Sequence, residues 1–146
     1  MEGSRGLGDV YKRQMMNNTL ALIKPDAMQK GFKDEIRKDI MDNGFIIAEE
    51  KTLHLSVEQA EGFYSIHKDK PFFGELVEFM TSSETHIMKL EKANAVLEWR
   101  NLMGATNPAE AEAGTIRAKY GTDISMNATH GSDSNENAEI EINFFF

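Results

Sequence analysis

One histidine in this chain stands among residues that could support chemistry on its ring. His130 lies within residues 127–134 (NATHGSDS), together with a glycine, two serines and an aspartate. Gly131 lets the backbone bend sharply and lets a bulky anion approach the imidazole. We therefore expect His130 on an exposed turn that suits phosphate chemistry. For this motif taken alone, a polar surface turn is the alternative.

A helix is predicted directly after this motif, over residues 135–141. Ser132 and Ser134 could accept hydrogen bonds from the first amides of that helix. Asp133 suits the positive end of the helix dipole. Residues 125–129 before the histidine can be extended. The local pattern is therefore strand, turn and helix, with His130 held from both sides.

Five further polar residues are candidates for binding phosphate. Arginine makes bidentate contacts with phosphate oxygens, whereas lysine provides a movable point charge. The sequence contains no Walker-A loop and no dinucleotide-binding glycine motif, so side chains would have to bind any phosphate. Taken singly, each cation is more often a solvated surface residue, and only convergence would make a site. The candidates are Lys24, Arg100 and Arg117, each at the end of an expected element, with Thr106 and Asn127 as neutral donors.

The composition limits the class of protein. A chain of 146 residues with 40% hydrophobic and 27% charged residues is typical of one globular domain with its own core. No apolar run is long enough to span a membrane. The absence of cysteine excludes disulfides and thiolate catalysis and fits a reducing cytoplasm. The formal net charge of −8 argues against broad binding to nucleic acid, although a local cluster of cations could bind polyphosphate.

The first fourteen residues differ from the rest of the chain. Residues 1–14 (MEGSRGLGDVYKRQ) are rich in glycine and charge, show no periodicity, and precede a second possible start at Met15 and Met16. They contain no apolar segment of the kind found in secretory signals. We expect a non-native leader over residues 1–14 and a single domain over residues 15–146. A native disordered tail is the alternative.

Apolar runs and helical periodicities alternate along the domain. A capping-box pattern at Ser56 starts one helix, and Asn43-Gly44 ends another. This order of elements predicts an α/β (α+β) sandwich in which helices cover a small sheet. The ferredoxin-like split βαβ fold, with a four-stranded antiparallel sheet, is the natural choice for four strands. The expected strands are 19–23, 45–55, 85–91 and 125–129, and the expected helices are 34–43, 56–67, 71–80, 95–103, 115–120 and 135–141.

Four segments of this sequence closely resemble the nucleoside diphosphate kinases. They are ALIKPDAMQKG, HKDKPFFGELVEFM, LMGATNPAEAEAGTIRAKYG and NATHGSDSNENAEIE. The resemblance covers about residues 18–142 without a gap. NxxHGSDS combined with TNPAxxxxGTIR is far more specific than either motif alone. The short ending resembles bacterial members.

The resemblance implies transfer of the γ-phosphoryl group of a nucleoside triphosphate to a nucleoside diphosphate. The mechanism would be ping-pong, through a phosphohistidine on His130. The implied catalytic residues are His130, Glu141, Ser132, Lys24 and Tyr64, and the implied nucleotide-binding residues are Lys24, Phe72, Arg100, Thr106, Arg117 and Asn127.

Some of these residues have an ordinary structural interpretation as well. Glu141 would hydrogen-bond the second nitrogen of the histidine, but it lies on an acidic helix whose charges are usually solvated. Phe72 would stack on the base and falls off the apolar stripe of its helix, but it could belong to the core. Tyr64 could simply pack with its hydroxyl at the surface.

The resemblance also implies a cofactor and partners. Mg²⁺ would be bound mainly by the nucleotide phosphates, with no dedicated protein ligands. The partners would be nucleoside di- and triphosphates and further copies of the chain, in a homo-oligomer built from dimers, either a tetramer or a hexamer. We expect a cytoplasmic protein that binds neither membrane nor nucleic acid.

Two alternatives and two departures accompany this interpretation. A non-catalytic nucleotide-binding regulatory protein could use the same fold. A metal site at His130 with Asp133 is disfavoured, because paired ligands are lacking. Residues 82–86 depart from the family pattern, and His86 makes the following strand more polar, which bears on local stability or oligomer packing. The three phenylalanines at 144–146 either pack against a neighbouring subunit or mark a truncated end.

Overall fold

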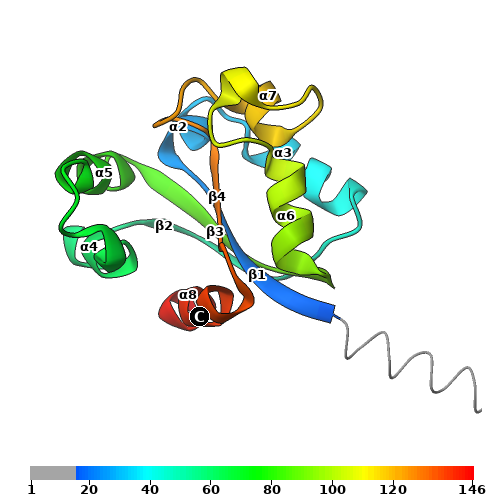
Figure 1. Ribbon diagram of the computed structural model, residues 1–146, viewed down its shortest axis with the longest axis horizontal. Helices are drawn as coiled ribbons and strands as arrows, with labels where there is room; N and C mark the ends of the chain where they lie inside the picture. Colours follow the sequence, from blue (N-terminus) through cyan, green and yellow to red (C-terminus); the bar gives the residue numbers. More distant parts are fainter. Residues whose placement is uncertain (1–15) are drawn as a thin grey trace, which may run out of the picture.

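A four-stranded antiparallel sheet forms the centre of the molecule (Figure 1). The computed structural model describes residues 16–146, so the expectation for residues 1–14 lies outside the described residues. The strands follow the spatial order β2-β3-β1-β4, and each neighbouring pair is antiparallel. The predicted sheet is thereby confirmed. Its strands are β1 (Met16–Ile23), β2 (Ile46–His54), β3 (Glu84–Ala93) and β4 (Thr129–Gly131).

Helices cover both faces of this sheet. Figure 1 shows α4, α5 and α8 to the left of the strands and below them, with α2, α3, α6 and α7 above and to the right. No helix formed by the described residues is both long and apolar enough to cross a membrane. The elements are α2 (Pro25–Gln29), α3 (Lys33–Asp42), α4 (Val57–Phe63), α5 (Phe73–Met80), α6 (Ala95–Met103), α7 (Ile116–Tyr120) and α8 (Asn135–Phe145), with 3₁₀ turns η1 (Ser65–His67) and η2 (Pro108–Glu110).

The central strand β1 separates two cores. Successive side chains of a strand point to opposite faces. Leu20 and Leu22 therefore pack into the core under α4, α5 and α8, while Ala21 and Ile23 pack into the core under α2, α3 and α6. All four side chains are fully buried. A strand covered on both faces reads as a continuous apolar run, which is why this segment shows no polar alternation.

Local signals set most helix ends, with one exception. The Ser56 hydroxyl accepts from the Gln59 amide at 3.1 Å, and the Gln59 side chain accepts from the Ser56 amide at 2.9 Å, as the capping-box pattern predicts. Gly44 follows α3 with a φ of +87°, which glycine adopts without strain. The residue type of Asn94, which precedes α6, predicts a helix cap, and that prediction is wrong. Asn94 has a φ of +55°, and its side chain makes no capping hydrogen bond.

The unusual His86 is accommodated by a polar network inside the fold. His86 is 4% exposed. Its Nδ1 lies 2.8 Å from the Thr52 hydroxyl, and its Nε2 lies 2.7 Å from a carboxylate oxygen of Glu50. Glu50 also accepts two hydrogen bonds from Arg37, each of 2.8 Å. Both ring nitrogens therefore have partners, which removes the cost of burying a polar ring in β3.

The terminal phenylalanines include one core residue. Phe145 is 6% exposed and packs against Phe63 of α4, with ring centroids 5.1 Å apart. Phe144 and Phe146 remain 44% and 39% exposed. Phe145 thus joins α8 to α4 within one chain.

Candidate active site

His130 lies inside a strand, not on the exposed turn expected from the sequence. It is the central residue of β4 and pairs with Leu22 of β1. The segment predicted to be extended, 125–129, forms bends instead, and β4 begins only at Thr129. One cause is the Asp123 carboxylate, which accepts from the amides of Ser125 at 2.9 Å and Met126 at 2.8 Å. Hydrogen bonds of this kind fold the chain into a turn.

The ring of His130 is held by a carboxylate and by two aromatic side chains. Its Nε2 lies 3.2 Å from Oε1 of Glu141, and the histidine and glutamate side chains are 25% and 20% exposed. The rings of Phe63 and Tyr64 stand edge-on to the imidazole, with centroids at 5.3 and 6.0 Å. An ionised carboxylate can only accept a hydrogen bond, so the proton of neutral His130 belongs on Nε2. Nδ1 therefore carries the free lone pair.

Ser132 supports this arrangement, although not as a helix cap. Its hydroxyl is fully buried and donates to Oε1 of Glu141 at 2.8 Å. It also accepts from the Leu20 amide of β1 at 3.4 Å. The predicted capping role of Ser132 is therefore wrong, whereas Ser134 caps α8 as predicted by accepting from the Asn137 amide at 3.1 Å.

Tyr64 and Glu141 share the small cavity beside His130. This cavity of ≈ 90 Å³ is lined by both residues and by the imidazole. Tyr64 is 7% exposed. Burial, and to a lesser extent the charge of Glu141, raises the pKa of the Tyr64 hydroxyl, so it stays protonated across the physiological range.

Lys24, at the end of β1, is connected to Thr106 through Asn127. Its ammonium donates to Oδ1 of Asn127 at 2.9 Å and to the Ser125 carbonyl at 3.2 Å. The Asn127 amide donates in turn to the Thr106 carbonyl at 3.0 Å. Burial lowers the pKa of Lys24 to about 8, and the charge of Asp26 partly offsets that effect. The lysine is therefore mostly charged at neutral pH.

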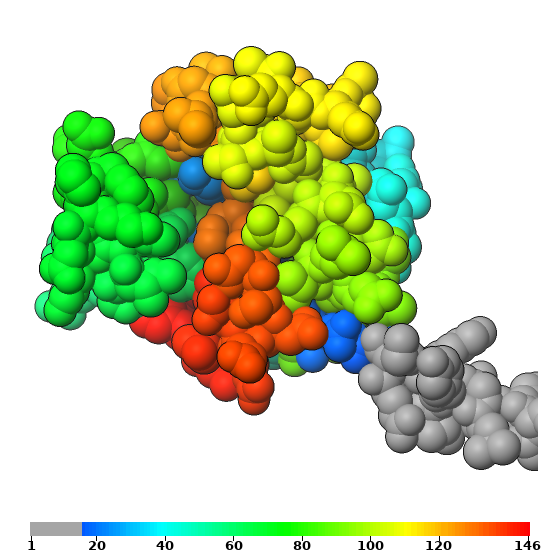
Figure 2. All heavy atoms as spheres, viewed as in Figure 1, coloured from blue at the N-terminus to red at the C-terminus, as the bar shows by residue number. Residues whose placement is uncertain are grey.

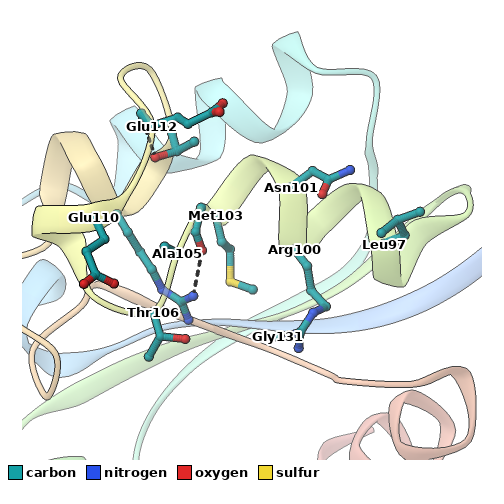
Figure 3. A pocket seen from close by; sticks show the side chains of 12 residues that line it. Leu97, Arg100, Asn101, Met103, Ala105, Thr106, Glu110, Glu112 and Gly131 are labelled. Atoms are coloured by element: carbon teal, nitrogen blue, oxygen red, sulfur yellow. Dashed lines mark hydrogen bonds between the residues drawn. The ribbon is translucent and has the colours of Figure 1, made fainter.

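Arg100 and Arg117 line a larger cavity of ≈ 560 Å³ next to the histidine. Figure 3 shows Arg100 and Thr106 directed into the region beside Gly131. Two hydrogen bonds fix the Arg117 side chain, which donates to the carbonyls of Gly104 and Thr129, both at 3.0 Å. Burial and the positive charge of Arg100 lower the pKa of Arg117 to about 10. Within residues 16–146 neither arginine forms an ion pair with a carboxylate. An anion in this cavity would stabilise both cations.

Gly131 joins the two cavities. It lines both of them. A β-carbon built at this position would lie 2.5 Å from Cδ1 of Trp99, so only glycine lets α6 approach β4 this closely. The Trp99 indole nitrogen also donates to the His130 carbonyl at 3.2 Å. Figure 2 shows a hollow between the helices α4 and α5 and the segment that follows α6.

Nine of the ten candidate residues thus line the two cavities or are linked by hydrogen bonds to residues that line them. Phe72 lies apart from this group. Phe72 is 47% exposed and lines neither cavity. Its ring lies 5.7 Å from that of His67. The sequence interpretation missed Asp26 and Trp99. Their side chains form hydrogen bonds with the backbone of Ala128 and of His130, respectively. Asp26 could have been noticed as an acidic residue at a strand–helix corner, whereas no pattern marks Trp99.

Known proteins are similar to this chain in sequence. The family model for nucleoside diphosphate kinase matches residues 17–146. The nucleoside diphosphate kinase of Chlamydia abortus is 56% identical over 131 residues, which are 90% of this chain and 93% of that protein. One from Campylobacter jejuni is also 56% identical, over 90% of this chain and 96% of that protein.

Solved structures give the same result. The nucleoside diphosphate kinase of Aquifex aeolicus superposes with a TM-score of 0.88 at 41% identity, over 90% of this chain and 95% of that one. The halophilic enzyme of Halobacterium salinarum, in complex with CDP, gives a TM-score of 0.85 at 39% identity, over 89% and 87% of the two chains. This chain therefore belongs to the nucleoside diphosphate kinase family.

Proposed function

We propose that this chain transfers the γ-phosphoryl group of a nucleoside triphosphate to a nucleoside diphosphate, with His130 as the covalent carrier. The observation that carries the proposal is the position of His130. A carboxylate fixes its Nε2, and its ring borders a cavity that shares Gly131 with a second one, which is lined by two arginines that form no ion pair within residues 16–146. The complex of the Halobacterium relative with CDP supports a nucleotide as the ligand.

The first half-reaction begins at Nδ1 of His130. Its lone pair attacks the γ-phosphorus, a nitrogen–phosphorus bond forms, and the bond from the γ-phosphorus to the bridging oxygen breaks. The nucleoside diphosphate leaves with the electron pair of that bond. The imidazole gains positive character, which the Glu141 carboxylate stabilises through Nε2–H. The second half-reaction runs the same steps in reverse with another nucleoside diphosphate.

The cations position the phosphates and neutralise their charge. Phosphoryl transfer passes through a loose transition state, so positioning and charge stabilisation provide most of the catalysis. Arg100 and Arg117 bind phosphate oxygens in the larger cavity, and the Thr106 hydroxyl donates to them. Lys24 also contacts the phosphates, and Lys24 and Asn127 contact the sugar hydroxyls. The edge-on ring of Tyr64 and the hydroxyl of Ser132 hold the histidine–glutamate pair in place.

A divalent metal ion accompanies nucleotides in this family, and we propose Mg²⁺. Mg²⁺ keeps several waters and prefers substrate phosphates to all-protein cages. Glu110 and Glu112 line the arginine cavity, so their carboxylates could accept hydrogen bonds from the waters of a bound ion. When bound, the ion would neutralise charge on the β- and γ-phosphates.

Base recognition and assembly complete the proposal. The exposed ring of Phe72 offers a face on which any base could stack, which favours broad base tolerance. A homo-oligomer built from dimers, tetramer or hexamer, remains the expected assembly. In support, β2 lies at the edge of the sheet and exposes 53% of Ile46. The cytoplasmic location is likewise part of this proposal.

Labelling with γ-labelled ATP and Mg²⁺ tests the proposal. Wild type should acquire one acid-labile, base-stable label, and added GDP should release it as GTP. His130→Ala should take up no label, while His54→Ala, which removes an exposed histidine of β2, should label normally. Folded wild type that binds nucleotide without labelling would instead favour the non-catalytic regulatory protein.

A further inference from the structure

We propose that Asp26 is a positioning residue of the phosphoryl-transfer site, which holds the backbone before His130 in a strained turn and places a negative charge beside Lys24. This inference rests on the function proposed above. Asp26 lies in the first turn of α2 and is 5% exposed. It lines neither of the two cavities that meet at Gly131, so it acts through its neighbours.

The backbone of Ala128 is held at both of its polar groups. Its amide donates to Oδ2 of Asp26 at 3.0 Å, and its carbonyl accepts from the Lys24 amide at 2.8 Å. Both partners belong to the corner between β1 and α2. The start of β4 is therefore attached to this corner two residues before the nucleophile.

Ala128 adopts a conformation that needs such support. Its φ is +74°, in the left-handed region that side chains with a β-carbon rarely adopt. The Thr129 amide donates to the Asn127 carbonyl at 2.9 Å, across Ala128. This hydrogen bond with a φ near +75° defines a γ-turn of the rare, strained type. Strained backbone persists only where surrounding contacts over-determine it, and the Asp26 carboxylate provides one of these contacts.

The turn sets the direction of two functional side chains. Asn127 precedes Ala128 and holds the ammonium of Lys24 at 2.9 Å. His130 follows it after one residue. A change of φ at Ala128 would therefore rotate Asn127, the hydrogen-bond partner of the Lys24 ammonium, relative to His130. Displacements of about 1 Å can slow an enzyme roughly 100-fold when they misalign reacting groups.

The charge of Asp26 has a second effect. The charged groups that face Lys24 are Asp26 on α2, Arg117 on α7 and Asp123 in the loop that follows α7. Burial and Arg117 lower the pKa of Lys24, and Asp26 is the strongest group that raises it. Removal of the Asp26 charge would lower this pKa further below about 8. Lys24 would then lose its proton, and its attraction for phosphate, at a lower pH.

Two substitutions separate the hydrogen bond from the charge. Asp26→Asn keeps an oxygen that can accept from the Ala128 amide but removes the charge. Asp26→Ala removes both. Asp42→Ala serves as the matched control, because Asp42 is an exposed carboxylate at the end of α3. Ala128→Gly, combined with Asp26→Ala, tests the strain, since glycine adopts positive φ without cost.

Rapid-quench measurement of His130 phosphorylation by γ-labelled ATP, with nucleotide affinity and thermal unfolding on the same samples, provides the main test. We expect Asp26→Ala to slow phosphorylation at least tenfold and Asp42→Ala to leave it unchanged. The double variant, Ala128→Gly combined with Asp26→Ala, should recover part of the phosphorylation rate that Asp26→Ala alone loses. A wild-type rate in folded Asp26→Ala would overturn the inference. A loss that simply follows unfolding, without recovery in the double variant, would do the same.

The pH profile of kcat/KM tests the charge and remains informative if Asp26→Ala does not fold. This profile reports the groups of the free enzyme. Asp26→Asn should resemble wild type near about pH 6, and its alkaline limb should move to lower pH. An unmoved alkaline limb would exclude the effect on Lys24. Failure of wild type itself to label would instead contradict the proposed function, so the two failures are distinguishable.

Discussion

Replacement of Glu141 by glutamine isolates the electrostatic part of the proposed mechanism. Glutamine has nearly the same shape as glutamate, and its carbonyl oxygen can still accept from Nε2 of His130 and from the Ser132 hydroxyl. The geometry of 3.2 Å and 2.8 Å can therefore be kept while the negative charge is lost. The change should matter most when the imidazole becomes positive, in the transition state and in the phosphohistidine.

The size of the effect follows from the distance and the exposure. Two unit charges about 4 Å apart interact with ~4 kcal/mol at an effective dielectric of about 20, and with ~1 kcal/mol in bulk water. The His130 and Glu141 side chains are 25% and 20% exposed, which places the pair between these limits. About 2–3 kcal/mol of transition-state stabilisation should be lost. That corresponds to a roughly 30- to 160-fold slower phosphorylation.

Single-turnover phosphorylation by γ-labelled ATP is the appropriate assay, because product release and nucleotide exchange do not enter it. The equilibrium affinity for nucleotide should stay within about twofold of wild type, since the glutamate contacts the histidine and not the phosphates. Phosphorylation should be slower in Glu141→Ala than in Glu141→Gln, because alanine also removes the hydrogen bond that orients the His130 imidazole. If Glu141→Gln phosphorylates at the wild-type rate, electrostatic stabilisation by this residue must be abandoned.

Two further substitutions test the surroundings of the site. Gly131→Ala should destabilise the protein by about 1–3 kcal/mol in thermal or denaturant unfolding, because its β-carbon would overlap Trp99. Gly74→Ala, where a β-carbon meets nothing within 4 Å, should cause no loss. Burial lowers the pKa of His86, so the stability that neutral His86 contributes is present above about pH 6.5 and is lost as the pH falls through its folded-state pKa. His86→Leu should therefore flatten the loss of unfolding free energy below about pH 6.5 by up to ~1.4 kcal/mol per pH unit, and an unchanged slope would contradict this role.

Sequence patterns predict the fold well where local and tertiary signals agree. The capping box at Ser56 and the glycine after α3 set helix ends through short-range hydrogen bonds and backbone freedom. The apolar run over residues 19–23 predicted a strand, and the structure shows that β1 is buried on both faces. Asn94 shows the limit of such reasoning. Its residue type is typical of a cap, but the path from β3 into α6 requires a left-handed residue, and asparagine tolerates that conformation.

The site itself was predictable in residue type but not in its local geometry. The family resemblance identified Glu141 as a site residue, whereas the charge pattern alone predicts a solvated residue on a helix face. The strand placement of His130 could not be predicted, because it depends on pairing with Leu22, more than a hundred positions earlier. The buried hydrogen bond from the Ala128 amide to Asp26 is equally non-local. Patterns of neighbouring residues contain no information on such contacts.

Strand β4 offers a physical reason for the proposed chemistry at this edge of the sheet. His130 turns its ring toward Phe63 and Tyr64 on one side, while Gly131 faces Trp99 on the other. Successive residues of one strand therefore contact both helical layers, which fixes the imidazole between them. The strand is only three residues long and lies at the end of the strand order. A short edge strand supplies rigid backbone for the proposed nucleophile and still leaves space beside it, through which the nucleotide phosphates of the proposed reaction would approach Nδ1.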